Sequence, residues 1–220
     1  FKIGSGEMTD TPTIKEIIKF RKPMLISTGM SKTMEIKRTY ELFKGKENPL
    51  CLMNCTSEYP PQIQDLNLKY ITKMKKIFKK AVIGHSDHTS DIYSSIIAAS
   101  LGAKFIEKHI YISEKFKGPD KDVSINISQL KKLAEILENV NLSLGSEKKI
   151  HKKEIPIRKW AFRSIISIRD IKKGEKIKKD MIWSKRPGTG IPSYKMNKII
   201  GKRVIRNLKK NTMLKMKDLK

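Results

Sequence analysis

The chain has 220 residues, 38% of them hydrophobic, which is enough to bury a sizeable core and allows one domain or one and a half. No apolar run reaches the roughly 18 residues of a membrane span, and no signal peptide opens the chain. We therefore expect a cytoplasmic protein without a membrane partner. The first residue is Phe1 rather than a methionine and already lies in a strand-like segment, so the sequence looks truncated.

The net charge of +26 could indicate a basic nucleic-acid-binding protein, because such a chain attracts phosphate backbones. Only eight of the 48 basic residues are arginine, and the lysines are scattered over every predicted helix instead of forming one stripe with aromatic residues between them. That distribution is typical of solvated helix faces. We expect no specific nucleic-acid partner, and the charge would secondarily help to attract anionic substrates.

From residue 1 to about residue 141, short apolar runs alternate with helix-period stretches, as in βαβ units with a parallel sheet. Strands are predicted at residues 1–5, 23–27, 50–54, 81–84 and 105–109, and helices at about 11–20, 31–43, 66–78, 91–100 and 127–142. Asp10 and Pro12 mark the first helix start as a cap and a first-turn proline. Cys51 and Cys55 belong to one strand segment, so we expect free thiols and a reducing compartment.

Strands joined in this way fit either an open doubly wound sheet or part of an eight-stranded barrel. Each predicted strand ends in small polar or ionisable residues: Lys2 and Ser5, Ser27 and Thr28, residues 54–57, residues 86–89, and Glu107 with His109. An open sheet would concentrate such residues at one switch point, whereas a barrel gathers all its strand ends around one mouth. The pattern therefore favours an α/β fold of the partial (β/α)8 TIM barrel type.

The texture of the sequence changes after about residue 142. Residues 143–159 are charged and show no period, which predicts a linker. Residues 160–220 contain short β-rich runs at 164–168, 181–185 and 202–204, broken by glycine, proline and asparagine. We predict a small β-rich domain with a modest core, which docks on another surface.

Two histidines follow neighbouring predicted strands, His88 and His109. Neighbouring strand ends lie about 5 Å apart, so the two imidazoles could share one divalent ion and leave positions for water and substrate oxygens. We expect Asp87 or Glu107 to hold a histidine ring in one tautomer. The alternative is a pair of hydrogen-bonded histidines that line a polar mouth, and the spacing does not decide between the two.

Two turns rich in glycine and serine, residues 4–7 and 27–30, each leave a strand and enter a helix. They offer backbone N–H groups, hydroxyls and a helix amino end to an anion, and Lys2 adds a positive charge. The turns indicate a phosphate or carboxylate site, although glycine and serine are common in any βα turn.

A third turn, residues 185–190, follows an apolar run and contains Arg186, Pro187 and two glycines. It would present the Arg186 guanidinium, which suits hydroxyls and carboxylates, in a rigid setting. A structural turn with an exposed arginine explains this segment equally well.

Seven segments carry a resemblance that covers nearly the whole chain: FKIGSGE, PMLISTGM, NCTSEYP, IGHSDHT, FIEKHI, GPD and KRPGTG. In this order they resemble the N-acetylneuraminate (sialic acid) synthases and the related legionaminic and pseudaminic acid synthases. The resemblance implies the last five β/α units of a TIM barrel, followed by a small β-rich antifreeze-like (SAF) domain. The missing front, about three of the eight strands, would carry a catalytic glutamate and further anion-binding groups.

The resemblance also implies the reaction. Phosphoenolpyruvate would condense with an N-acylated amino sugar, N-acetylmannosamine or a 2,4-diamino hexose, to give a nonulosonic acid and phosphate for the biosynthesis of surface polysaccharides or glycans. Ser57 stands where some sialic acid synthases have asparagine, and Glu58 lies beside it, so the sugar stays open. The alternatives are another metal-dependent TIM-barrel aldolase or lyase that acts on a phosphorylated sugar, and the nucleic-acid-binding protein considered above.

Site residues follow position by position from the matching motifs. The predicted phosphoenolpyruvate contacts are Lys2, Ser5, Ser27, Ser57 and Ser86. The predicted sugar contacts are Tyr59, Asp120 and Arg186. The predicted catalytic set is His88, His109 and Glu107, with His88 and His109 as ligands of a manganese-class ion, magnesium or cobalt being alternatives. In the family the SAF domain reaches across a homodimer, so Arg186 would complete the partner subunit's site.

Overall fold

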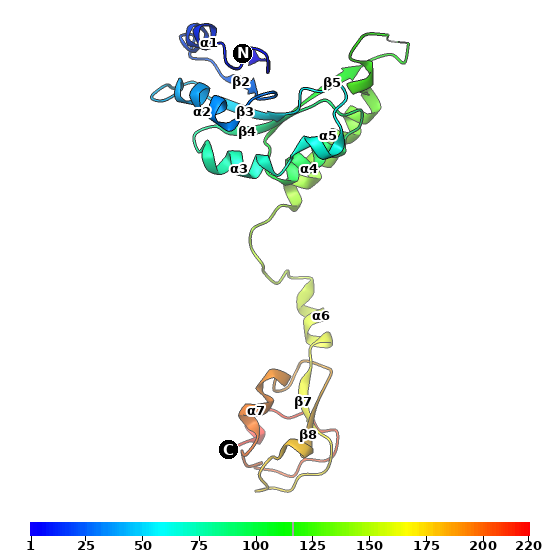
Figure 1. The fold of residues 1–220 in the computed structure, drawn as a ribbon. Helices are drawn as coiled ribbons and strands as arrows, with labels where there is room; N and C mark the ends of the chain where they lie inside the picture. Colours follow the sequence, from blue (N-terminus) through cyan, green and yellow to red (C-terminus); the bar gives the residue numbers. More distant parts are fainter. Residues whose placement is uncertain (116) are drawn as a thin grey trace. The chain divides into compact units, whose positions relative to one another are not determined.

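The alternating pattern of the first 145 residues gives one sheet of six parallel strands in the computed structural model, which describes residues 1–115 and 117–220 (Figure 1). The strands are β1 (Lys2–Ile3), β2 (Met24–Ser27), β3 (Leu50–Cys55), β4 (Val82–Asp87), β5 (Phe105–Tyr111) and β6 (Ser124–Asn126). They lie in the sheet in chain order, without the reversal that creates the switch point of a doubly wound sheet.

Five helices of this unit follow the predicted ones closely: α1 (Thr11–Ile18), α2 (Thr33–Glu41), α3 (Tyr70–Ile77), α4 (Tyr93–Ser100) and α5 (Ile127–Ser143). Asp10 caps α1 by accepting a hydrogen bond from the Thr13 N–H, as the sequence predicted. Among the residues that the structure describes, no helix combines the length and the apolar character needed to cross a bilayer.

The sixth strand, β6, was not predicted. It has three residues and pairs with β5, where Ser124 lies beside His109. Three residues are too few to show a period of two, so only the neighbouring strand identifies this segment as part of the sheet.

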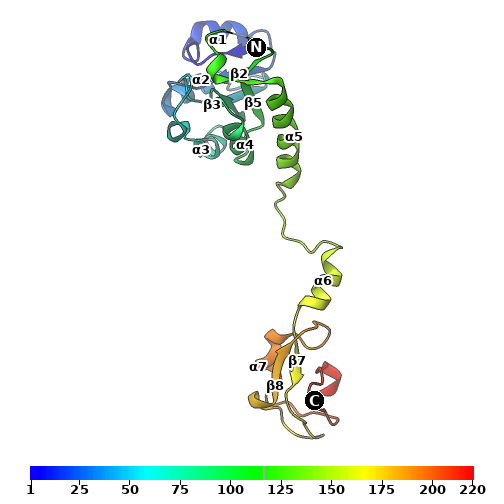
Figure 2. The ribbon, with the colours of Figure 1, turned by 90° about the vertical axis from the view of Figure 1, so that its right-hand side faces the viewer.

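The sheet is strongly curled. The Lys2 Nζ lies 3.3 Å from Glu107 Oε1, although three strands separate β1 from β5. At about 4.8 Å between neighbouring strands, a flat sheet would place these two backbones about 19 Å apart, more than the two side chains can bridge. The strands therefore form a half-barrel, and Figure 2 shows the helices arranged around its outside.

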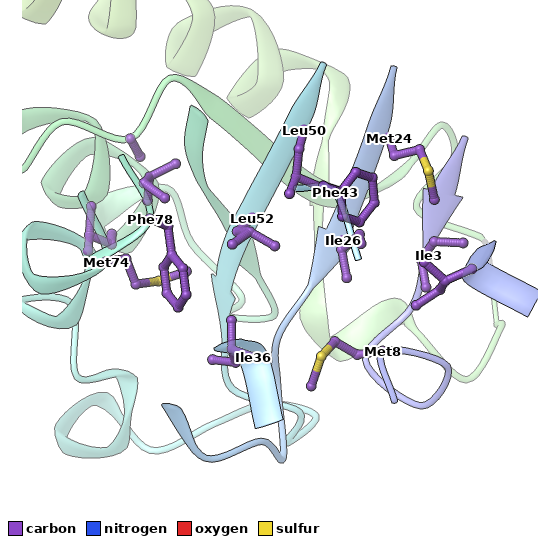
Figure 3. Close-up of a cluster of buried hydrophobic side chains, with 14 of the residues drawn as sticks. Ile3, Met8, Met24, Ile26, Ile36, Phe43, Leu50, Leu52, Met74 and Phe78 are labelled. Atoms are coloured by element: carbon purple, nitrogen blue, oxygen red, sulfur yellow. The ribbon is translucent and has the colours of Figure 1, made fainter. Parts of the chain in front are cut away.

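Alternate residues of each strand face opposite sides of the curled sheet. Ile3, Ile26, Leu52 and Ile83 face outward and are buried against the helices in one apolar cluster, part of which is drawn in Figure 3. The helices contribute buried residues to the same cluster: Ile14, Ile36, Ile71 and Met74, with Phe78 at the end of α3. The intervening residues of the strands consequently face the inside of the half-barrel.

A second unit comprises residues 146–220. It contains an antiparallel pair, β7 (Ser164–Ser167) and β8 (Ile182–Lys185), and two helices, α6 (Glu154–Ala161) and α7 (Met196–Ile199). Its own apolar core consists of Ile165, Ile171, Ile177, Met181, Ile182, Ile191, Ile199, Val204, Leu208 and Leu214. This unit is therefore held together by its own buried side chains, as a small β-rich domain requires.

Two predictions for this part of the chain need correction. Of the β-rich run at 202–204, only Arg203 and Val204 pair with other segments, in isolated bridges to Lys176 and Leu219. The predicted linker, 143–159, is helical at its end, where α6 begins at Glu154. Helix α6 buries none of its residues, so it does not contribute to the core of the second unit.

The first prediction concerns the outer core. Phe78 is fully buried and packs edge-on against Tyr40, with ring centroids 5.1 Å apart. Phe78→Ala should lower the free energy of unfolding of the first unit by about 3–5 kcal/mol, because it removes apolar contacts and leaves a cavity. Phe20→Ala, at a side chain that is 63% exposed, is the matched control for urea unfolding. Equal losses in both variants would contradict the packing.

The second prediction concerns Asp218, which is 1% exposed in the second unit. Burial opposes its ionisation, but hydrogen bonds from Arg206 Nε (2.7 Å) and the Lys215 N–H (2.8 Å) outweigh burial and hold the pKa of Asp218 below its usual value. A lowered pKa stabilises the fold above the unfolded value of about 3.9, and this contribution is lost as the pH falls through the folded value.

Asp218→Asn should therefore lower the free energy of unfolding by about 1–3 kcal/mol at pH 7 and by much less near pH 3. Thermal unfolding at the two pH values measures both effects, with exposed Asp180→Asn as the control. A loss that is as large at pH 3 as at pH 7 would refute the role of the ionised carboxylate.

Candidate functional site

The inner face of the half-barrel carries a cluster of predicted site residues from three strands. Ser86 Oγ donates a hydrogen bond of 2.7 Å to Glu107 Oε1, and the Lys2 ammonium lies 3.3 Å from the same oxygen. Lys2 and Glu107 are partly exposed, so solvent and small anions can reach them. An anion that binds here would compete with Glu107 for Lys2 and Ser86.

The turns after β1, β2 and β3 converge beside this cluster. The Gly29 N–H donates a hydrogen bond of 3.1 Å to Ser5 Oγ, and a Cβ added at Gly29 would clash with Ser57 Oγ and Ser5 Oγ. Only glycine therefore allows the turns to approach this closely. Ser27 is buried, and its Oγ has no hydrogen-bond partner within residues 1–115 and 117–220. Four predicted anion contacts, Ser5, Ser27, Ser57 and Lys2, thus belong to neighbouring strand ends.

The two predicted metal ligands lie close together. The ring centroids of His88 and His109 are 5.3 Å apart. His88 Nδ1 lies 2.9 Å from the Thr56 carbonyl oxygen, and His109 Nδ1 lies 3.6 Å from Asp120 Oδ2. An oxygen beside Nδ1 favours the tautomer that carries its proton there and leaves a lone pair on Nε2. At His88 the Tyr59 hydroxyl lies 3.0 Å from Nε2, so a cation that binds there would have to displace it.

Two predicted sugar contacts adjoin the histidines. The Tyr59 hydroxyl is 3.0 Å from His88 Nε2, its ring stacks on His88 at 4.2 Å, and it meets His109 edge-on at 5.9 Å. Asp120 contacts His109 from the loop before β6. Residues predicted separately for the metal and for the sugar therefore form one continuous group.

These donors fit a divalent cation in part. The described part of the chain contains no group of three or more histidine, cysteine, aspartate or glutamate residues arranged to hold a metal ion. The two imidazoles, with Nδ1 directed at oxygen atoms, suit two positions of a zinc- or manganese-like ion. The remaining positions would have to come from water or from a substrate, as in an open catalytic site.

The expectation that Asp87 or Glu107 holds a histidine ring in one tautomer was wrong. Glu107 contacts Lys2 and Ser86 instead, and Asp87 faces the opposite side of the sheet from Ser86 and Glu107. The period of two along β4 explains the position of Asp87. The oxygen atoms beside the histidines belong to the Thr56 backbone, which has no sequence signal, and to Asp120, which was predicted only as a sugar contact.

Sequence reasoning missed a buried polar cluster behind the histidines. Lys108 Nζ lies 3.3 Å from Asp87 Oδ2, and the two side chains are 3% and 0% exposed. The signal was present, because Lys108 stands opposite Asp87 in the register and follows the outward-facing Ile106 by two positions. A charged residue in an outward, helix-covered row of a strand requires a buried partner.

Two further expectations concern Cys51, Cys55 and Arg186. Both thiols are free, as predicted, and burial together with Glu107 raises the pKa of Cys51 to about 12.

Arg186 belongs to the second unit, where its Nε donates a hydrogen bond of 3.1 Å to the Ala161 carbonyl oxygen and its guanidinium lies 4.8 Å from the Trp160 ring centroid. Its contact with the sugar across a homodimer stays a prediction.

Comparisons with known proteins agree with this division. The sequence matches the NeuB family over residues 1–149 and the SAF domain over residues 162–220. The N,N'-diacetyllegionaminic acid synthase of Campylobacter jejuni is 34% identical over 219 residues, or 98% of this chain and 65% of the relative. The pseudaminic acid synthase of the same bacterium is 33% identical over 220 residues, or 99% of this chain and 64% of the relative.

A solved structure shares the fold. The N-acetylneuraminic acid (sialic acid) synthetase of Leptospira borgpetersenii, in complex with citrate, superposes with a TM-score of 0.66 at 29% identity, over 71% of this chain and 55% of that one. The chain thus spans less than two thirds of the length of the curated relatives described above. Since the family match covers more than half of the chain and these relatives align with almost all of it, the chain belongs to the NeuB family and carries a SAF domain.

Proposed function

We propose that the protein condenses phosphoenolpyruvate with an N-acylated amino sugar to give a nonulosonic acid and phosphate. The relatives named above are synthases of legionaminic, pseudaminic and sialic acids, which supports this reaction class. One observation carries the proposal: the Lys2–Ser86–Glu107 cluster and the His88–His109 pair lie side by side on the inside of one curled sheet. Strands β4 and β5 and the residues that directly follow them contribute to both groups. We further propose that this sheet is the larger part of a (β/α)8 barrel whose mouth holds the site.

The anion end of the proposed site is formed by the turns. The partly exposed Lys2 ammonium and the Ser27 hydroxyl, which has no hydrogen-bond partner among the described residues, are suited to the phosphate and carboxylate of phosphoenolpyruvate. Ser5, Ser57 and the Gly29 turn add hydroxyl and backbone groups next to them. Their work is to fix the orientation of the enol and to balance its negative charge.

The sugar end is formed by the histidines and their neighbours. His88 and His109 would hold a divalent cation, manganese in our proposal, with magnesium and cobalt as alternatives. Bound there, such a cation supplies Lewis-acid polarisation of an aldehyde oxygen. Tyr59 and Asp120, which contact the two histidines, would orient the sugar. The Ser57–Glu58 pair leaves the identity of the acceptor open.

The proposed reaction forms one carbon–carbon bond and releases one phosphate. The methylene carbon of the enol forms a bond to the aldehyde carbon, whose oxygen takes up a proton. The hydroxyl of a water molecule adds to the carbon that carries the phosphate ester, and the other proton of that water is the one that the aldehyde oxygen takes up. The bond from this carbon to the ester oxygen then breaks, and the phosphate leaves with the proton of the new hydroxyl, so that the carbon becomes the ketone. The products are the keto acid and inorganic phosphate.

The third prediction tests the substrates with the longest form of the protein that its gene encodes. Phosphate should be released only when phosphoenolpyruvate, a divalent cation and N-acetylmannosamine or a 2,4-diacetamido hexose are all present. Omission of each component in turn is the control. Phosphate release without any sugar would contradict the condensation and would favour a different metal-dependent enzyme that acts on phosphorylated sugars.

The fourth prediction concerns the two histidines. His88→Ala or His109→Ala should abolish metal-dependent turnover, a larger loss than the about 10- to 100-fold typical of a residue that only supports a metal ligand. The fold should persist, because the helix-side core that contains Phe78 does not include these side chains. Exposed His151→Ala is the control, and circular dichroism monitors folding. Unchanged turnover of the double variant at limiting metal would refute the assignment.

A further inference from the structure

A buried ion pair lies on the outer face of the sheet, directly behind the two histidines. Asp87 ends β4, Lys108 lies opposite it in β5, and their side chains are 3.3 Å apart and almost fully buried. Each charged residue immediately precedes a histidine in the sequence, Asp87 before His88 and Lys108 before His109. The two strands therefore place an ion pair on one face and an imidazole pair at the mouth.

The Asp87 carboxylate fixes the turn that contains His88. Asp87 Oδ1 accepts hydrogen bonds of 2.8 Å from both the backbone N–H and the hydroxyl of Thr89. This Asx-type turn closes around His88, the residue between the two partners, and restricts its backbone. The carboxylate thus links the two residues that flank His88.

Lys108 ties this turn to the strand that carries His109. Its ammonium donates to the Thr89 carbonyl oxygen and, at 3.2 Å, to the Thr89 hydroxyl, besides its contact with Asp87. One side chain on β5 thus binds both residues that flank His88. A change in the separation of the two strand ends would have to break these bonds.

Helix α4 completes the network. Ser94 and Ser95 both donate their hydroxyl hydrogens to Asp87 Oδ2, Ser95 at 2.6 Å, and both are buried. Together with Thr89 and Lys108, they give the carboxylate four side-chain partners.

Stability alone does not require charges in this place. A buried ion pair is often no more stabilising than apolar residues of similar volume, because both charges must leave water. The outward rows of the same strands also hold apolar residues, Ile106 one step before Lys108 and Ile83 two steps before Asp87, with buried His85 between Ile83 and Asp87. A charged, hydrogen-bonded network fixes the positions of its residues more strictly, because hydrogen bonds require particular angles and distances and apolar packing does not.

We infer that Asp87 and Lys108 are positioning residues, which hold the strand ends so that His88 and His109 can bind one divalent cation. The inference rests on the proposed function, in which the two histidines hold the metal. Neither Asp87 nor Lys108 touches the substrate in this scheme. Their effect passes through the backbone of the His88 turn and through the register of β4 and β5.

Direct titration with Mn²⁺, with the free ion followed by electron paramagnetic resonance, tests the inference without any substrate. In the longest form of the protein that its gene encodes, Lys108→Met should weaken Mn²⁺ binding by about 10- to 100-fold. Ser95→Ala, which removes one hydroxyl donor, should weaken it by less and in the same direction. If Lys108→Met does not fold, the isosteric Asp87→Asn takes its place.

A matched control separates positioning from a general loss of stability. Asn48 is buried and donates hydrogen bonds to the Ile18 and Lys22 carbonyl oxygens near the amino end of β3, away from the mouth. Asn48→Ala should lower the melting temperature but leave the affinity for Mn²⁺ unchanged. In kinetics, Lys108→Met should regain turnover at high Mn²⁺, while the KM for phosphoenolpyruvate changes little.

The outcomes distinguish the two proposals. Folded variants at Asp87, Ser95 and Lys108 that all bind Mn²⁺ like the unmodified protein would overturn the positioning role and leave the proposed function intact. An unmodified protein that binds Mn²⁺ but releases no phosphate would overturn the proposed reaction, and the affinities of the variants would still decide the positioning role. An unmodified protein that binds no Mn²⁺ would end both the metal assignment and the inference.

Discussion

The curl of the parallel sheet is the constraint on which the rest of the first unit depends. In a flat sheet the side chains of β1 and β5 could not meet, yet Lys2 and Glu107 are in contact. Curling makes one face of the sheet concave and leaves the convex face to be covered by the helices, so that the two faces carry different kinds of residues. The concave face collects hydroxyls, imidazoles and charges, and the convex face buries isoleucine, leucine and methionine against α1 to α4.

The strands obtain both faces from the same short sequences because their side chains alternate. In β4, Ile83 packs on the helices and Ser86 faces the inside, where it bonds Glu107. The convex face is not uniformly apolar, however. Near the carboxyl ends of the strands it becomes polar, with Asp87 and Lys108 in place of isoleucine. Asp87 and Lys108 therefore lie next to the candidate site. Their burial costs free energy of desolvation at this place in the fold.

Three carboxylates in and behind the candidate site each lie beside a basic side chain. Glu107 faces Lys2 inside the half-barrel, Asp120 faces His109 at the mouth, and Asp87 faces Lys108 outside. Most lysines of the chain, whose net charge is +26, lie on solvated surfaces instead. In the second unit, the buried carboxylate of Asp218 likewise has a basic partner: it accepts hydrogen bonds from Arg206 and from a backbone N–H.

The sequence by itself determined the α/β class, the parallel strands β1 to β5, the five helices of the first unit, the free thiols and the change of texture near residue 143, because each leaves a periodic or compositional signal. Its motifs also named the residues that the fold gathers at the mouth. Only the tertiary structure decided the three-residue strand β6, the helix α6 with no buried face, and the partners of Asp87 and Glu107. These depend on strand register, on backbone oxygens such as that of Thr56, and on contacts between residues far apart in the chain, none of which has a local pattern.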